Sequence, residues 1–249
     1  MRLTVFLNAD GDFGLPVEYN YLLQAALYQQ IEQPALRNFL HEQGFELGRR
    51  KFKLLTFSRL QGRLRVDKAG SKMIFSPPVR FTVCSPLSYL VQEMGNGFLK
   101  QGRIRLGEAL LEVEKVEVAE TVVREREIWV QMLSPLVVYS TLESSGARYT
   151  YYYSPFEPRF GELVLANLAK KYLLIFGRPA DTRDFSIVPV EVGEKDFKIV
   201  KYKGTVIKGW MGTYRLQGDP QLLEVGLSAG LGSKNSQGFG CCEHTQPSI

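Results

Sequence analysis

The sequence predicts an α+β protein built from two tandem ferredoxin-like domains, an N-terminal one at residues 1–120 and a C-terminal one at residues 121–249. One basis is the expected order of strand, helix, strand, strand, helix and strand in each half, which is the βαββαβ plan of that fold. The other is the length of 249 residues, which suits two domains of ordinary size. The junction is expected near Glu120, ahead of a short charged stretch.

The N-terminal half opens with an alternating apolar pattern at residues 2–8, which predicts a strand. Residues 19–32 follow with apolar side chains four apart on one stripe, which is typical of an amphipathic helix. A second helix is expected over residues 34–43, because proline is tolerated in its first turn and Gly44 ends it. The remaining elements expected in this half are strands over residues 53–58, 71–83 and 109–119, and a helix over residues 86–94 that Gly95-Asn96-Gly97 ends.

The C-terminal half is expected to repeat this order in pattern but not in residues. Its longest apolar periodic stretch predicts a helix over residues 158–176, and a second helix is expected over residues 220–229. The strands or extended segments expected around them cover residues 128–133, 137–141, 148–153, 185–192, 205–217 and 238–243.

Composition and charge narrow the class of protein. Hydrophobic residues make up 45% of the chain and charged residues 23%, as in a folded domain, and no apolar run reaches the length of a membrane span or a signal peptide. We therefore expect a cytoplasmic protein with no membrane partner. The net charge of +5 favours an anionic partner without deciding which one. Three cysteines without CxxC spacing and two histidines predict no metal site, no disulfide framework and no cofactor.

Residues 230–240 contain four glycines and a lysine close to the C-terminus. Glycine lets backbone N–H groups converge and the lysine adds a cation, so this stretch suits an anionic nucleic-acid backbone. The alternative is a glycine hairpin without a ligand, in which the asparagine serves only the turn. It is not a Walker loop, because no Lys-Ser or Lys-Thr pair closes it. The candidates for RNA binding in this stretch are Gly230, Gly232, Lys234, Asn235, Gly238 and Gly240.

Three side-chain types suggest chemistry in the first half. His41 is expected off the buried face of its helix, where solvent or a substrate reaches it, and Tyr28 at the edge of the preceding helix's apolar stripe. The alternatives are a surface histidine and a packed tyrosine. Lys51 and Lys53 are two apart where a strand begins, so they point to the same side and can hold a phosphate. They belong to the densest cationic run of the chain, Arg49-Arg50-Lys51-Phe52-Lys53, in which Arg49, Arg50 and Lys51 are candidates for RNA binding. The alternative for this run is a solvated face.

An imidazole, a phenol and an ammonium group are able to cleave RNA without a metal. The ribose 2′-hydroxyl attacks the adjacent phosphorus, the histidine and tyrosine move protons at the entering and leaving oxygens, and a lysine offsets the charge on the phosphoryl oxygens. DNA lacks that hydroxyl and would be bound but not cut.

Two sets of motifs resemble a known family. The segment Gly230-x-Gly232-x-x-Asn235-x-x-Gly238-Phe239-Gly240 is similar to the glycine-rich loop of the CRISPR-associated endoribonucleases of the sixth Cas family, which are RAMP proteins that process precursor CRISPR RNA within its repeats. Residues 21–28, 40–42 and 53–58 are similar to archaeal-type members whose active site is a tyrosine, histidine and lysine set.

The resemblance implies that Tyr28, His41 and Lys53 are catalytic, with Lys51 as the alternative lysine. It also implies a metal-independent cut that leaves a 5′-hydroxyl and a 2′,3′-cyclic or 3′ phosphate, with repeat RNA bound in the basic cleft between the domains. It leaves open whether subunits of a CRISPR effector complex or a second copy of the chain are further partners. The competing hypotheses are a non-catalytic RAMP subunit that holds guide RNA, and an enzyme that binds a small phosphorylated metabolite at the glycine-rich loop.

Overall fold

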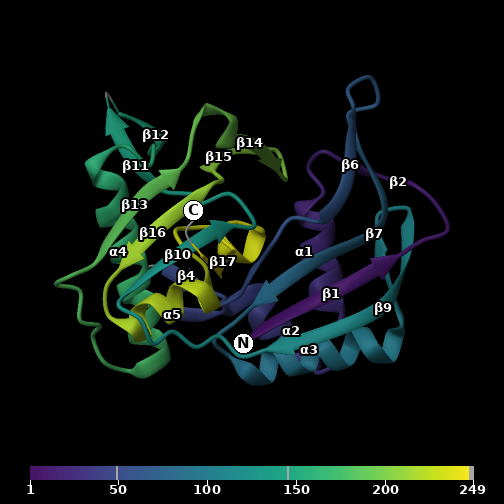
Figure 1. Cartoon of the computed structure of the whole chain (residues 1–249), viewed down its shortest axis with the longest axis horizontal. Helices are drawn as coiled ribbons and strands as arrows, with labels where there is room; N and C mark the ends of the chain where they lie inside the picture. Colours follow the sequence, from purple (N-terminus) through teal and green to yellow (C-terminus); the bar gives the residue numbers. More distant parts are fainter. Residues whose placement is uncertain (49, 145, 247–249) are drawn as a thin grey trace.

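The structure is a computed structural model that describes residues 1–48, 50–144 and 146–246. Two antiparallel sheets, one in each half of the chain, lie side by side, and the helices pack against them (Figure 1). Within the described ranges, no helix combines the length and the apolar character that a membrane crossing requires. The expected boundary at Glu120 falls between the last strand of the first sheet and the first strand of the second.

The first sheet is centred on β1 (Arg2–Asn8), which pairs with β7 (Lys72–Cys84) on one side and β9 (Ala109–Ala119) on the other. Every second residue of β1 is buried, and these residues pack with α1 (Asn20–Gln29) and α3 (Ser88–Gln101) into one hydrophobic core. The other elements of this half are β2 (Phe13–Pro16), α2 (Pro34–Asn38), β3 (Phe45–Leu47), β4 (Arg50–Phe52), β5 (Thr56–Phe57), β6 (Gln61–Asp67) and β8 (Arg103–Leu106).

The second sheet has the order β13-β16-β10-β17, and two helices, α4 (Pro158–Phe176) and α5 (Pro220–Ala229), contribute to its core. Two hairpins are added to this plan, β11 with β12 and β14 with β15. The bounds of these strands are β10 (Glu127–Met132), β11 (Tyr139–Ser144), β12 (Ala147–Tyr152), β13 (Ser186–Glu191), β14 (Phe197–Tyr202), β15 (Thr205–Trp210), β16 (Thr213–Gln217) and β17 (Cys242–Thr245).

Both sheets arrange their four core strands in the same way. In the first, β9 lies beside β1, β1 beside β7, and β7 beside β5 and β6. In the second, β17 lies beside β10, β10 beside β16, and β16 beside β13. In each half, the fourth strand of the βαββαβ order therefore neighbours the first, and the third neighbours both the first and the second. The predicted α+β class with two ferredoxin-like units is confirmed.

The expected helix at residues 86–94 was too short, because Gly95 and Gly97 do not end it. Both glycines lie inside α3 and are buried. A Cβ atom on Gly97 would overlap the carbonyl oxygen of Gln30 at the end of α1. Glycine is required there for the close approach of two helices, and the helix continues to Gln101, where Gly102 caps it in the left-handed region at φ 65°.

Backbone geometry explains three strand expectations that were also inaccurate. The strand expected over residues 53–58 is limited to β5, because Leu54 adopts a φ of 49°. The strand expected over residues 205–217 divides into β15 and β16 at Gly212, whose φ is 96°. The closing strand begins at Cys242 and not at Gly238, because Gly238 and Gly240 have φ values of 85° and 71°. Strands β2, β3, β4, β6, β8 and β14 were not predicted.

Candidate functional site

A π-helical turn presents His41. Helix α2 continues into Phe39–Gln43, where the N–H of Gly44 donates to the carbonyl oxygen of Phe39 at 2.7 Å. This widened turn buries Leu40 and leaves the next side chain, His41, exposed. Turns of this kind are rare and are frequently found at functional sites. The predicted exposure of His41 is confirmed.

Tyr28 approaches His41 from α1. The two ring centroids are 6.0 Å apart and the rings meet edge to face at 76°. The tyrosine side chain is only 7% exposed, and burial, with a smaller contribution from Tyr202, raises its pKa to about 12. The phenol is therefore neutral and keeps its proton at neutral pH.

Lys53 completes this group from the segment after β4. Its Nζ donates to the carbonyl oxygen of His41 at 3.2 Å. Burial, followed by repulsion from Lys51, lowers its pKa. The other candidate, Lys51, lies on the β3–β4 hairpin, where its ammonium group contacts the Glu46 carboxylate at 3.2 Å. The structure thus brings Lys53 to the histidine and turns Lys51 toward an acidic partner, while the catalytic role of each residue stays a prediction.

Gly44 makes the position of Lys53 possible. Its φ of 70° and ψ of −173° belong to a region that only glycine occupies readily. A Cβ atom at this position would lie 2.6 Å from the carbonyl oxygen of Phe52 and 2.8 Å from Cδ of Lys53. The lysine stem therefore crosses directly over Gly44 to reach the turn that holds His41. From the sequence, Gly44 was predicted only to end a helix.

A polar stripe on α1, the helix that carries Tyr28, binds the glycine-rich loop of the other domain. Asn20 donates through Nδ2 to the carbonyl oxygens of Gln237 at 3.1 Å and Gly238 at 3.2 Å. Gln24 donates through Nε2 to the carbonyl oxygen of Ser236 at 2.5 Å. Asn20, Gln24 and Tyr28 are four residues apart and so share one helix face. This anchor was not predicted from the sequence, although the two amides are four residues apart on one predicted helix.

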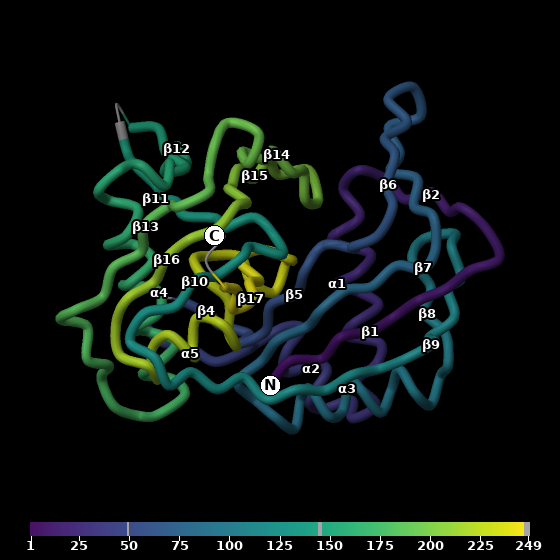
Figure 2. The backbone as a smooth tube through the Cα atoms, in the orientation of Figure 1, coloured from purple at the N-terminus to yellow at the C-terminus, as the bar shows by residue number. Residues whose placement is uncertain are grey.

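The glycine-rich loop packs between the two domains. Figure 2 shows this C-terminal segment in yellow at the centre of the molecule, beside β5. A Cβ on Gly238 would lie 2.5 Å from Cε2 of Phe57, which belongs to the first domain. A Cβ on Gly232 would lie 2.5 Å from the carbonyl oxygen of Val137, which belongs to the second. All four glycines of the loop, Gly230, Gly232, Gly238 and Gly240, are buried, so the structure gives them a packing role and their assignment to RNA binding stays a prediction.

Asn235 holds this loop together from within. Its Nδ2 donates to the carbonyl oxygens of Leu231 at 2.9 Å and Phe239 at 3.1 Å. Its Oδ1 accepts a hydrogen bond from Lys171 at 2.8 Å. This is the turn role that was considered as the alternative for this residue, and a contact with RNA stays a prediction.

Lys171, on α4, was not identified from the sequence. Its ammonium group is buried and also donates to the carbonyl oxygens of Gly230 at 2.6 Å and Gly232 at 3.3 Å. Burial lowers its pKa to about 7. The residue lies three positions after the buried Leu168, on the apolar side of the helix. A lysine on that face was the signal that could have identified it.

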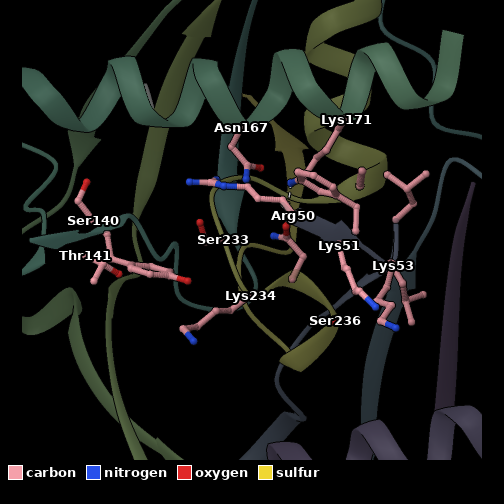
Figure 3. Close-up of a pocket in the computed structure, with 16 residues that line it drawn as sticks. Arg50, Lys51, Lys53, Ser140, Thr141, Asn167, Lys171, Ser233, Lys234 and Ser236 are labelled. Atoms are coloured by element: carbon pink, nitrogen blue, oxygen red, sulfur yellow. Dashed lines mark hydrogen bonds between the residues drawn. The ribbon is translucent and has the colours of Figure 1, made fainter. Parts of the chain in front are cut away.

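A pocket of about 520 Å³ opens between the domains next to Lys53. Asn167 and Lys171 point into it from α4, opposite the segment that carries Lys51 and Lys53 (Figure 3). Its basic lining residues are Arg50, Lys51, Lys53, Lys171 and Lys234. No carboxylate lines it within the described part of the chain.

Two of the predicted RNA-binding cations have distinct surroundings. Lys234 lies with its Nζ 5.2 Å from the ring centroid of Tyr139, and burial lowers its pKa. Arg50 is exposed and lines the pocket. Arg49, the remaining predicted cation, lies outside the described residues.

Comparisons with known proteins agree with this architecture. The C-terminal family model for CRISPR associated protein Cas6 matches residues 116–244, and the N-terminal Cas6 model matches residues 14–117. The chain is 27% identical to CRISPR-associated endoribonuclease Cas6 1 of Methanocaldococcus jannaschii, over 96% of this chain and 91% of that protein. It is 26% identical to CRISPR-associated endoribonuclease Cas6 of Pyrococcus furiosus, over 93% of this chain and 84% of that protein.

A solved structure has the same fold. It belongs to the work "Characterization of a Cas6-related gene from Pyrococcus furiosus", and it superimposes on this chain with a TM-score of 0.85 at 18% identity. The match covers 100% of this chain and 99% of the other. At this identity the likeness concerns the fold alone.

Proposed function

Because the chain belongs to the Cas6 family of CRISPR-associated proteins, we propose that it is an endoribonuclease that cuts precursor CRISPR RNA within its repeats. The observation that carries the proposal is the cluster at the protein surface, where the Tyr28 ring lies edge-on to His41 and Lys53 bonds the backbone of His41. The names of the two endoribonuclease relatives support the same reaction class.

The proposed reaction uses the RNA's own nucleophile. The 2′-oxygen attacks the adjacent phosphorus as its proton leaves, the bond from phosphorus to the 5′-oxygen breaks, and that oxygen gains a proton. The products are a 2′,3′-cyclic phosphate, which water can open to a 3′ phosphate, and a 5′-hydroxyl. The side chains of His41, Tyr28 and Lys53 supply the proton donor, the hydrogen bond and the positive charge that these steps need, so the proposed route is metal-independent.

The surroundings of the three side chains suggest their roles. Imidazole exchanges protons near neutral pH, and His41 is exposed, so His41 donates the proton to the leaving 5′-oxygen. Tyr28, whose pKa is raised to about 12, enters as a neutral phenol that orients the attacking 2′-oxygen by a hydrogen bond, while the 2′ proton passes to solvent. Lys53 offsets the negative charge that builds on the phosphoryl oxygens.

The decisive experiment is cleavage of a CRISPR repeat RNA in EDTA. We expect cleavage to persist, and a 2′-deoxy substitution at the scissile nucleotide to abolish it. His41→Ala should slow the step by about 10²–10⁴-fold, the usual contribution of a general acid, while binding to the deoxy RNA is unchanged. If His41→Ala cuts as fast as the wild type, the assigned proton donor is wrong. If the protein binds repeat RNA tightly but cuts none, it is the non-catalytic RAMP subunit considered above.

The wider partners belong to the same proposal. Repeat RNA lies across the basic cleft between the domains, with Arg50 and Lys234 among its contacts. Membership of a CRISPR effector complex, formation of a homodimer and a cytoplasmic location stay predictions. Size-exclusion chromatography with light scattering, with and without repeat RNA, tests the homodimer.

A further inference from the structure

The pocket next to Lys53 is separate from the cluster formed by Tyr28 and His41, neither of which lines it. Its walls come from five places in the chain: the segment around β4, strand β11, helix α4, the end of helix α5 and the glycine-rich loop (Figure 3). Lys53 belongs to both the pocket and the catalytic cluster. A group bound in the pocket would therefore lie beside the phosphate that the cluster acts on.

The lining is suited to a nucleotide. Cations surround the opening, and the hydroxyl groups of Ser140, Thr141, Ser233 and Ser236 also line it. Ammonium, guanidinium and hydroxyl groups are the usual contacts of phosphate and ribose oxygens. A volume of about 520 Å³ has room for one nucleotide but not for a helical stack of bases.

Asn167 supplies a group that can contact a base. The residue is only 7% exposed, and its side chain points from α4 into the pocket (Figure 3). Within the described residues, its Oδ1 atom is buried without a hydrogen-bond partner. A buried amide oxygen without a partner is costly, and rotation of the amide exchanges its oxygen and nitrogen, so either can face a ligand.

From these observations we propose that the pocket holds one unpaired nucleotide of the RNA, adjacent to the scissile phosphate, and that Asn167 hydrogen-bonds the edge of its base. This inference rests on the proposed function, because it takes RNA as the ligand. It adds a recognition site at which the identity of a single base affects binding. RNA is read in this way where bases are unstacked and splayed from the strand.

The test measures affinity and not cleavage, so that it stands apart from the catalytic proposal. The probe is fluorescent repeat RNA with a 2′-deoxy substitution at the scissile nucleotide, which is bound but not cut. Single abasic sites are placed in turn at each position within three nucleotides of the scissile phosphate. We expect one position to lose about tenfold in affinity and its neighbours to lose little, as for the removal of one specific base contact.

Asn167→Ala should lower the affinity for intact RNA by the same factor and abolish the sensitivity to the abasic site at that one position. The matched control is Asn96→Ala, an exposed asparagine within α3, which should retain the wild-type pattern. Ser140→Trp adds a bulky side chain to the pocket lining from β11, and it should give the same loss if Asn167→Ala fails to fold.

Two results would overturn the inference. One is a wild-type protein that is indifferent to every abasic site tested. The other is an Asn167→Ala or Ser140→Trp variant that keeps the full wild-type pattern. Neither result bears on catalysis, because cleavage of intact RNA in EDTA would still proceed through His41. Conversely, loss of cleavage with an intact abasic pattern refutes the enzyme and leaves the nucleotide site.

Discussion

Replacing Gly44 by alanine is expected to slow RNA cleavage by moving Lys53. The new methyl group would lie 2.8 Å from Cδ of Lys53 and 2.6 Å from the carbonyl oxygen of Phe52. Real Cβ atoms do not approach other heavy atoms this closely, and the carbonyl oxygen is fixed in the chain. The backbone at residue 44 must therefore move away from the Phe52 carbonyl, and the lysine stem must move away from the methyl group, which separates its Nζ from the carbonyl oxygen of His41.

The size of the effect follows from two costs. A non-glycine residue in the backbone region of Gly44 costs about 1–3 kcal/mol. At about 2–4 °C per kcal/mol for a chain of this size, the melting temperature should fall by roughly 2–12 °C. Displacement of a catalytic group by about 1 Å costs about 10²-fold in rate, so single-turnover cleavage should slow by about that factor.

The assay is single-turnover cleavage of repeat RNA at saturating protein, below the melting temperature of each variant. Gly48→Ala is the matched control, because Gly48 also has a positive φ, of 59°, but its Cβ would meet nothing within 4 Å. It should share the loss of stability and retain the cleavage rate. The double variant Gly44→Ala/Lys53→Ala should cut no slower than Lys53→Ala alone, since both changes act on one group.

The reasoning fails if Gly44→Ala slows the Lys53→Ala variant by a further factor of about 10². Such additivity would mean that the glycine acts elsewhere, for example on the turn that carries His41. It also fails if Gly48→Ala loses as much activity as Gly44→Ala, because backbone strain in the hairpin would then explain both.

Three further predictions concern the glycine-rich loop and its lysines. Burial lowers the pKa of Lys171 to about 7 from its ordinary value of 10.5, so between these pH values the unfolded chain binds a proton that the folded chain lacks. This residue therefore makes the free energy of unfolding rise with pH by up to about 1.4 kcal/mol per pH unit across that window. Lys171→Met should flatten this pH dependence, measured by denaturant titrations at pH 6 to 10. An unchanged pH dependence would exclude a neutral Lys171 in the folded protein. Lys234→Ala should weaken RNA binding broadly and make it less sensitive to salt, while cleavage of bound RNA slows less. Equal RNA affinity of the variant and the wild type would show that Lys234 does not contact RNA. Gly238→Ala should destabilise the protein by more than about 1 kcal/mol, because its methyl group would meet the Phe57 ring and the amide of Asn20. Thermal melts should show this as a lower melting temperature. An unchanged melting temperature would show that the loop does not join the domains.

Periodic burial made the fold readable from the sequence. The helices at residues 158–176 and 220–229 have the predicted bounds, because proline begins each and apolar side chains recur on one face. The same argument placed His41 off the buried face of its helix, as the structure confirms. These features depend on residues within a few positions of one another, so the local sequence is enough to predict them.

The role of each glycine could not be read in the same way. Gly97 continues a helix where sequence reasoning ended one, because it faces the carbonyl oxygen of Gln30. Gly238 packs against Phe57, a residue from the opposite end of the chain. A glycine in the sequence indicates only that a side chain is absent. Which atoms occupy the position of the missing Cβ depends on segments that are distant in the sequence.

The sequence by itself determined the two-domain βαββαβ plan and named Tyr28, His41 and Lys53 as partners. Only the tertiary structure decided that Lys53 and not Lys51 reaches the turn of His41, that Lys171 is buried within the glycine-rich loop, and that Asn167 faces the pocket. The physical reason is that strand and helix patterns follow from local burial, whereas hydrogen bonds and pockets form where the two domains meet.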